Sequence, residues 1–200
     1  MAIVDGYCTL SEVKSALRLS DSIDDTLIEK SIEGASRRID GYCGRFFYKT
    51  SPTAVRLFAY DSYRLPVNDI SSTTGLIVKL DNDGNGTYEQ TLTLNTDYIV
   101  EPTDFAIYDR PIRTISMIGG ATFPISTLPA IPLVQVTAAW GFDAVPHDVR
   151  EACVLLSIRQ FARFNAALGV MAFADMAITV RAVDPDVRDL LLPYRLLGVA

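Results

Sequence analysis

Histidine, cysteine and lysine are all scarce in this chain of 200 residues, which contains one histidine, three cysteines and four lysines. Cys8, Cys43 and Cys153 are far apart along the sequence, so neither a disulfide framework nor a CxxC metal site is indicated. The single histidine, His147, would need a nucleophile and an orienting carboxylate to act as a general base. Phosphate-loop, GxGxxG, HExxH and GxSxG motifs are missing as well. We therefore predict that the protein is not an enzyme and has no catalytic residue, no cofactor and no metal.

Positive charge is also in short supply, because 18 basic residues face 24 acidic ones and the net charge at pH 7 is −6. A protein that coats nucleic acid needs a basic surface to neutralise phosphates, so that class is excluded. Arginines recur on two predicted helices, at Arg37, Arg38, Arg45, Arg150, Arg159 and Arg163. Acidic neighbours match or outnumber them, so we interpret these faces as solvated or as ion pairs between subunits.

Long apolar runs are missing too. The most apolar stretch, residues 164–180, is interrupted by Asn165, Gly169 and Asp175, and it is too short to span a bilayer. The first residues have no basic region followed by an apolar one, so we expect no secretory signal. These features predict synthesis in a reducing cytoplasm and no contact with a membrane.

What the sequence does contain first is a helical pattern over residues 1–45. Thr9 and Glu12 fit a capping box at the start of a short helix. A second, longer helix is expected to begin within residues 22–25 and to end at Gly44. Its apolar stripe has helical spacing and consists of Ile28, Ile32, Ala35, Ile39 and Tyr42.

Residues 46–140 change to short β-type runs separated by Gly, Pro, Asn and Asp. Strands are predicted at 53–60, 76–80, 88–94, 98–101, 112–118 and 133–139, enough for a small sheet or barrel. The polar segment 68–75 is interpreted as a turn. Residues 141–200 return to helix, with a long helix at 146–164 that is apolar on more than one face and a short one at 184–192 that Pro193 ends. The sequence predicts an α+β fold, in which residues 1–45 and 141–200 form a small helical bundle and residues 46–140 an inserted antiparallel β subdomain.

One motif suggests a metal. Asp81, Asp83 and Asn85 have the spacing of the first oxygen ligands in an EF-hand loop. The twelfth position is Leu92, where a bidentate Glu is needed, and strands rather than helices flank the segment. A β-hairpin turn is the favoured interpretation, and a Ca²⁺-binding module is the alternative.

Five segments resemble a known family. They are residues 7–19, 24–30, 35–47, 136–152 and 184–194. Their features are a leucine-rich helix, an Asp-Asp pair, a helix ending in Tyr-Cys-Gly-Arg, and a helix start of the form Gly-aromatic-x-x-Val-Pro-x-Asp-Val. Together they cover about half of the chain and resemble the head–tail connector (adaptor) family of tailed bacteriophages.

The resemblance implies a structural role in the virion neck, after assembly in the host cytoplasm. Such adaptors form a ring, usually of twelve copies, below the portal protein, extend the DNA channel, and dock the next neck component, a stopper, tail-completion or tail protein. DNA would pass through without sequence-specific binding, and the acidic balance predicts a net negative channel wall. Another neck or tail-completion protein is the alternative.

The apolar surplus after residue 145 supplies the expected contacts. A subunit interface is predicted at Phe161, Phe164, Val170, Met171 and Phe173. The C-terminal residues are too apolar for solvent, and a contact with the portal is predicted at Leu190, Tyr194, Arg195, Leu196 and Leu197.

Overall fold

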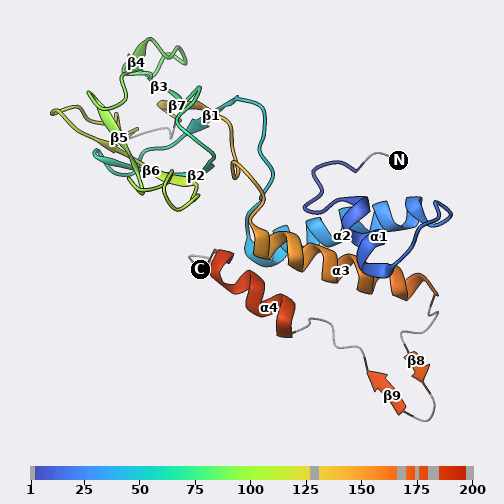
Figure 1. The fold of residues 1–200 in the computed structure, drawn as a ribbon. Coiled ribbons are helices and arrows are strands. Elements are labelled where there is room, and N and C mark those ends of the chain that lie inside the picture. The colour runs from blue at the N-terminus through green and yellow to red at the C-terminus, as the bar shows by residue number, and fades with distance from the viewer. Residues whose placement is uncertain (1–2, 127–130, 166–169, 174–175, 180–184, 197–200) are drawn as a thin grey trace. The chain divides into compact units, whose positions relative to one another are not determined.

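The computed structural model describes residues 3–126, 131–165, 170–173, 176–179 and 185–196 (Figure 1). The chain forms two compact units, one from residues 1–48 with 145–200 and one from residues 49–144. The first unit is mainly helical and the second is built from antiparallel strands. The predicted α+β class is therefore confirmed.

The helical unit begins with two helices that follow the sequence pattern closely. Helix α1 spans Leu10–Leu17 and opens with the predicted capping box, in which the side chains of Thr9 and Glu12 each accept a backbone N–H. Helix α2 spans Asp25–Cys43 and ends at Gly44, whose φ of 69° is the left-handed conformation that glycine adopts most easily. Its predicted stripe is buried, with Cys43 rather than Tyr42 at the last position.

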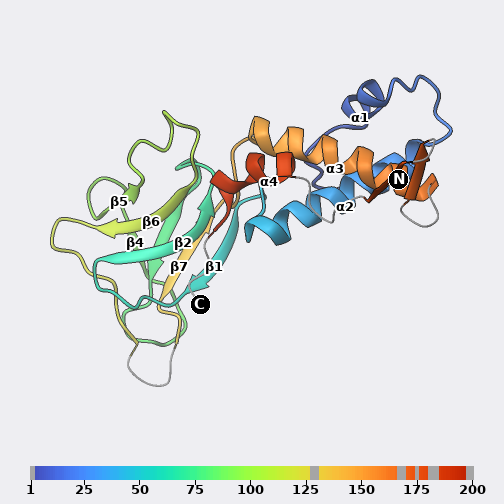
Figure 2. The same ribbon diagram turned by 90° about the horizontal axis from the view of Figure 1, so that it is seen from below.

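Helix α3, His147–Asn165, packs along α2, and the two run side by side (Figure 2). It buries Val149, Ala152, Cys153, Leu156 and Phe161. Leu155 and Phe164 lie on its outer side with 38 % and 52 % of their area exposed. The excess of apolar residues noted in the sequence therefore reaches the surface of this unit.

The end of the chain adds a short helix, α4 (Pro185–Leu191), that packs on α3. A single 3-10 turn, η1, follows at Leu192–Tyr194 and includes Pro193. Between α3 and α4 the backbone forms a hairpin from β8 (Val170–Phe173) and β9 (Met176–Thr179). The sequence predicted no strand there, because the segment has neither a turn dipeptide nor alternating polarity.

The β unit contains two antiparallel sheets. The first has the order β1 (Thr53–Leu57), β7 (Val134–Ala138), β3 (Ile77–Leu80), β4 (Gln90–Leu92). The second has the order β2 (Arg64–Ile70), β6 (Ile112–Met117), β5 (Tyr98–Glu101). A bridge between Ile70 and Trp140 connects them, and the Trp140 indole N–H donates to the Thr53 carbonyl at 2.9 Å.

Each of the six predicted strands exists, but β2 was missed. Its burial alternates as expected for a strand, with Leu65, Val67 and Asp69 inside. Pro66 and the polar Asn68 and Asp69 hid that alternation, and the segment from Asn68 to Ile70 was wrongly assigned to a turn. Pro66 is tolerated because β2 is an edge strand, where a missing N–H breaks no central ladder.

Candidate assembly surfaces

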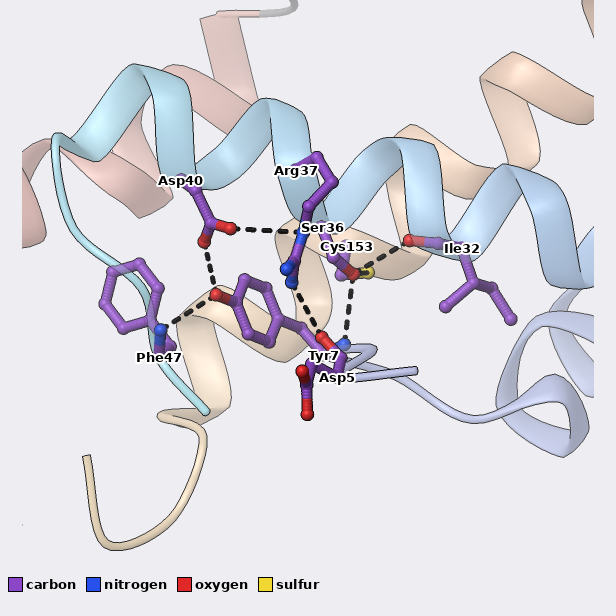
Figure 3. A network of polar contacts seen from close by, with 8 residues as sticks. All are labelled: Asp5, Tyr7, Ile32, Ser36, Arg37, Asp40, Phe47 and Cys153. Carbon is purple, nitrogen blue, oxygen red and sulfur yellow. Dashed lines mark hydrogen bonds and ion pairs between the residues drawn. The ribbon is translucent and has the colours of Figure 1, made fainter. Parts of the chain in front are cut away.

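Tyr7 is the centre of a polar network that fastens the first residues of the chain to α2 (Figure 3). Its backbone N–H donates to the Ser36 hydroxyl at 3.1 Å, and its phenol donates to the Asp40 carboxylate. The phenol oxygen accepts the backbone N–H of Phe47 at 2.8 Å, and the two rings meet edge to face at 5.6 Å. Only 2 % of Tyr7 is exposed. This one side chain therefore joins the N-terminal segment to both α2 and the residues that follow it.

The network also contains an arginine. Arg37 forms an ion pair with Asp40 at 3.2 Å and donates to the Asp5 carbonyl at 2.8 Å. Burial raises the pKa of Asp40, although the Tyr7 phenol and Arg37 act against this. Burial and the hydrogen bond to Asp40 raise the pKa of Tyr7 well above its usual value. Every group has a structural partner, so the network positions the chain rather than activating a nucleophile.

All three cysteines are buried free thiols. Two of them meet, because the sulfurs of Cys8 and Cys153 are 3.2 Å apart, and the hydroxyl of Ser36 lies 3.5 Å from Cys153. The hydrogen bond to Cys153 and burial raise the pKa of Cys8. The pair joins the N-terminal segment to α3.

The C-terminal segment lies against its own helical unit. The Tyr194 ring meets Phe47 at 5.7 Å, the Arg195 guanidinium lies 5.4 Å from the Tyr42 ring centre, and the Leu196 N–H donates to the Cys43 carbonyl at 2.8 Å. Leu190 is half-buried beside the buried Leu191. Leu197 lies outside the described residues. Packing against residues of the same chain therefore explains at least part of the apolar character of this segment.

The residues predicted for the subunit interface differ in burial and lie on different elements of the structure. Phe161 is 7 % exposed and belongs to the core of the helical unit, whereas Phe164 is 52 % exposed. Val170, Met171 and Phe173 lie on strand β8, and their side chains fall outside the described part. We therefore leave Phe161 out of the proposed contact and keep the other four as predictions.

A groove between α2 and α3 contains Phe164. Its volume is about 490 Å³, and we call it the arginine groove; it is lined by Gly34, Arg38, Leu156, Arg159, Gln160, Arg163 and Phe164. Three arginines and two apolar side chains thus share one hollow of an acidic protein. The sequence placed these arginines on two separate helices, and only the antiparallel packing of α2 on α3 brings them together.

The segment with the EF-hand spacing forms the turn between β3 and β4. Asp81 is buried, and its carboxylate accepts the backbone N–H groups of Gly84 (2.8 Å), Asn85 (3.2 Å) and Gly86 (2.8 Å). Burial alone would raise the pKa of Asp81, but these bonds hold it below its usual value. Asp83 and Glu89 lie near enough to share a cation with Asp81. The carboxylate is nevertheless surrounded by N–H donors, an arrangement that stabilises a turn and competes with a cation.

The remaining predicted features are unremarkable in the structure. His147 is exposed at the first position of α3. Within the described residues, no helix combines the length and the hydropathy needed to cross a bilayer.

The comparisons with known proteins agree with this architecture. The fold is similar to a chain in the structure "Neck of empty GTA particle computed with C6 symmetry", with a TM-score of 0.58 and 15 % identity over 100 % of this chain and 95 % of that one. It is also similar to a chain in "Neck of native GTA particle computed with C12 symmetry", with a TM-score of 0.55 and 20 % identity over 100 % and 94 % of the two chains.

The fold likeness extends to a chain in "Virion of native gene transfer agent (GTA) particle", with a TM-score of 0.54 and 20 % identity over 100 % and 95 % of the chains. No curated protein sequence matches. Residues 7–98, which include α1, α2 and the first strands of the β unit, match the family described as "Phage gp6-like head-tail connector protein". This match agrees with the resemblance found in the sequence and covers just under half of the chain.

Proposed function

We propose that the protein is a structural component of the neck of a tailed phage or phage-like particle, an adaptor that forms a ring below the portal. The observation that carries the proposal is the family match over residues 7–98. The fold likeness to neck chains over the whole chain supports it, and one of those necks was computed with twelve-fold symmetry. The proposed site of action is the virion neck.

In this proposal the ring extends the DNA channel and docks a stopper, tail-completion or tail protein. The net charge of −6 supports a channel wall that repels phosphates, so DNA would slide through without being bound. In this role the residues hold neighbouring copies together and do not catalyse a reaction. The described polar clusters support this, because their donors and acceptors are engaged within the fold.

The direct test is negative-stain imaging of the protein mixed with the portal of the same particle. We expect a ring stacked coaxially on the portal. A pull-down with portal and tail proteins in parallel separates the adaptor from the alternative, another neck or tail-completion protein. Binding to the tail alone would overturn the adaptor proposal and favour that alternative.

The portal contact is proposed at the C-terminal segment, with Leu190, Tyr194, Arg195, Leu196 and Leu197. Deleting the whole segment is a poor test, because Leu191 is 2 % exposed and Tyr194 packs on Phe47. Leu192 is 53 % exposed, so Leu192→Asp removes apolar surface without opening the core. We expect this variant to lose portal binding at least tenfold, while Leu155→Asp on α3 serves as the matched control. Equal portal binding by both variants would overturn the assignment of this segment.

A further inference from the structure

The loop between α1 and α2 displays an isoleucine to solvent. Ile23 is 86 % exposed, and we call residues 19–24 the Ile23 loop. The loop has a defined shape, since the Ile23 N–H donates to the Asp21 carboxylate at 3.1 Å. Lys14 of α1 donates to the Asp21 carbonyl and forms an ion pair with Asp25 at 2.6 Å. An apolar side chain on a fastened loop loses little conformational entropy on binding, so it is suited to be an anchor.

The arginine groove has the complementary properties. Leu156 and Phe164 give it apolar surface, while Arg38, Arg159 and Arg163 give it positive charge. The Ile23 loop has the opposite sign, because the carboxylates of Asp21 and Asp24 stand on either side of the isoleucine. A volume of about 490 Å³ is ample for one isoleucine side chain together with its neighbours. The two surfaces therefore match in both polarity and charge.

The loop does not fill the groove of its own chain. Ile23 would not be 86 % exposed if it did. Helix α2 begins at Asp25, and at a rise of 1.5 Å per residue Gly34 in the groove lies about 14 Å further along the helix. The ion pair between Lys14 and Asp25 holds the loop at the start of α2. The partner that the groove fits is therefore the loop of another copy.

We propose that the Ile23 loop of one copy enters the arginine groove of the next copy. The two surfaces differ, so the contact is head-to-tail. Repetition of one such contact closes a ring when a whole number of the rotations between copies makes one full turn, without a shift along the axis. The inference rests on the proposed ring and names the residues that form it. Ile23 is the apolar anchor, and the exposed Arg163 pairs with the carboxylates beside Ile23.

The test uses two variants of the full chain that each damage one surface. Ile23→Asp removes the anchor and keeps the groove, whereas the double variant Arg163→Glu/Phe164→Asp removes the groove and keeps the loop. Both sets of residues are exposed, and circular dichroism checks that the helices persist. Ile107→Asp is the matched control, because Ile107 is 79 % exposed on the β unit.

Light scattering after size-exclusion chromatography gives the outcome. We expect the wild-type chain and the Ile107→Asp control to form closed oligomers, and each interface variant alone to be a monomer. An equimolar mixture of the two interface variants retains one intact loop and one intact groove per pair, so it should form a dimer that grows no further. Rings from either variant alone, or a mixture that stays monomeric, would overturn the inference.

A wild-type chain that is monomeric at its highest soluble concentration would overturn it too. That result leaves the proposed neck role open to its own test, which is the image of the protein on the portal. Conversely, rings that follow the expected pattern but bind neither portal nor tail support this contact and contradict the adaptor role.

Discussion

The helical unit and the β unit are held together in different ways. Strand ladders hold the β unit, whose fully buried residues include Ile70, Ile112, Ile115, Val134 and Val136, and which also buries the carboxylates of Asp69 and Asp81. The helical unit is assembled from both ends of the chain, and its buried polar side chains among the described residues are serines, namely Ser31, Ser36 and Ser157. Backbone hydrogen bonds between strands hold the β unit, whereas side-chain contacts between the two ends of the chain hold the helical unit.

The two units also differ in what they leave exposed. Where the structure describes the side chains of the helical unit, the exposed large apolar residues are Val4, Ile23, Leu155, Phe164 and Leu192, four of them aliphatic. In the β unit, the exposed large apolar residues are the aromatic Phe58, Tyr60, Tyr63 and Tyr108 and the aliphatic Ile77, Ile107 and Ile125. Tyrosine keeps its hydroxyl in water at little cost, whereas exposed aliphatic side chains gain most when a partner covers them. The comparison directs the search for assembly contacts to the helices.

The largest effect is expected from Tyr7→Ala. Truncating a buried aromatic ring costs about 3–5 kcal/mol, and here the Asp40 and Phe47 partners are orphaned as well. Hydrogen exchange should accelerate in α2 and α3 while β6 and β7 stay protected. Tyr63→Ala is the control, because Tyr63 is 60 % exposed in the β unit and its loss should change stability by less than about 0.5 kcal/mol.

The converse variant is Ile115→Ala in β6, which empties space in the core of the β unit. Ile115 is fully buried, and such truncations cost about 2–5 kcal/mol. The amides of β2, β5 and β6 should exchange faster, while those of α2 keep their wild-type rates. Equal acceleration in both units would mean that they unfold as one, and the comparison would fail.

Tyr7→Phe removes the hydroxyl and keeps the ring, so it measures the contribution of the hydroxyl to stability. The aromatic contact with Phe47 remains, but the half-buried Asp40 and the Phe47 N–H lose a partner, at a cost of about 1–3 kcal/mol in urea unfolding. The cost should depend on pH. The folded pKa of Asp40 is raised by burial, so the folded state binds a proton more tightly and stability falls as pH rises through that window.

The phenol of Tyr7 acts to lower the pKa of Asp40, so the Phe variant should show a steeper loss of stability toward neutral pH than the wild type. Adding Asp40→Asn to the variant should flatten the slope. An unchanged pH profile in Tyr7→Phe would show that the hydroxyl does not couple to Asp40.

The smallest effect is expected at the start of α1, where Thr9→Ala removes the cap and costs about 1 kcal/mol. Ser11→Ala, at the exposed second residue of the same helix, is the matched control. The Thr9 backbone N–H holds the pKa of Glu12 below its usual value, so the contribution of Glu12 is present above that usual value and is lost as pH falls. Urea midpoints at several pH values measure both effects.

Local patterns made most of the helical elements predictable. Thr9 and Glu12 are three residues apart, and the stripe from Ile28 to Ile39 repeats along one helix, so the information lies within a few turns. Strand β2 was missed because Pro66 and Asn68 contradict a strand locally, and only its place at a sheet edge explains them.

The candidate site was less predictable, because its partners are distant in sequence. Tyr7 and Asp40 are 33 positions apart, and Cys8 and Cys153 are 145 apart. No spacing rule connects such pairs, and an aromatic residue ahead of the first helix was the only available signal for Tyr7. The arginine groove likewise combines residues from α2 and α3, which the sequence describes as separate faces.

The contact between Cys8 and Cys153 provides the molecule with a native probe of its own motions. Both thiols are shielded from solvent, so a thiol-reactive dye can label them only when the N-terminal segment lifts from α2 and α3. In the limit of fast reclosing, the labelling rate relative to a free thiol reports the free energy of that opening. Cys43, buried near the end of α2, serves as an internal reference, so the chain can be followed from the free subunit into an assembled particle without introducing a label site.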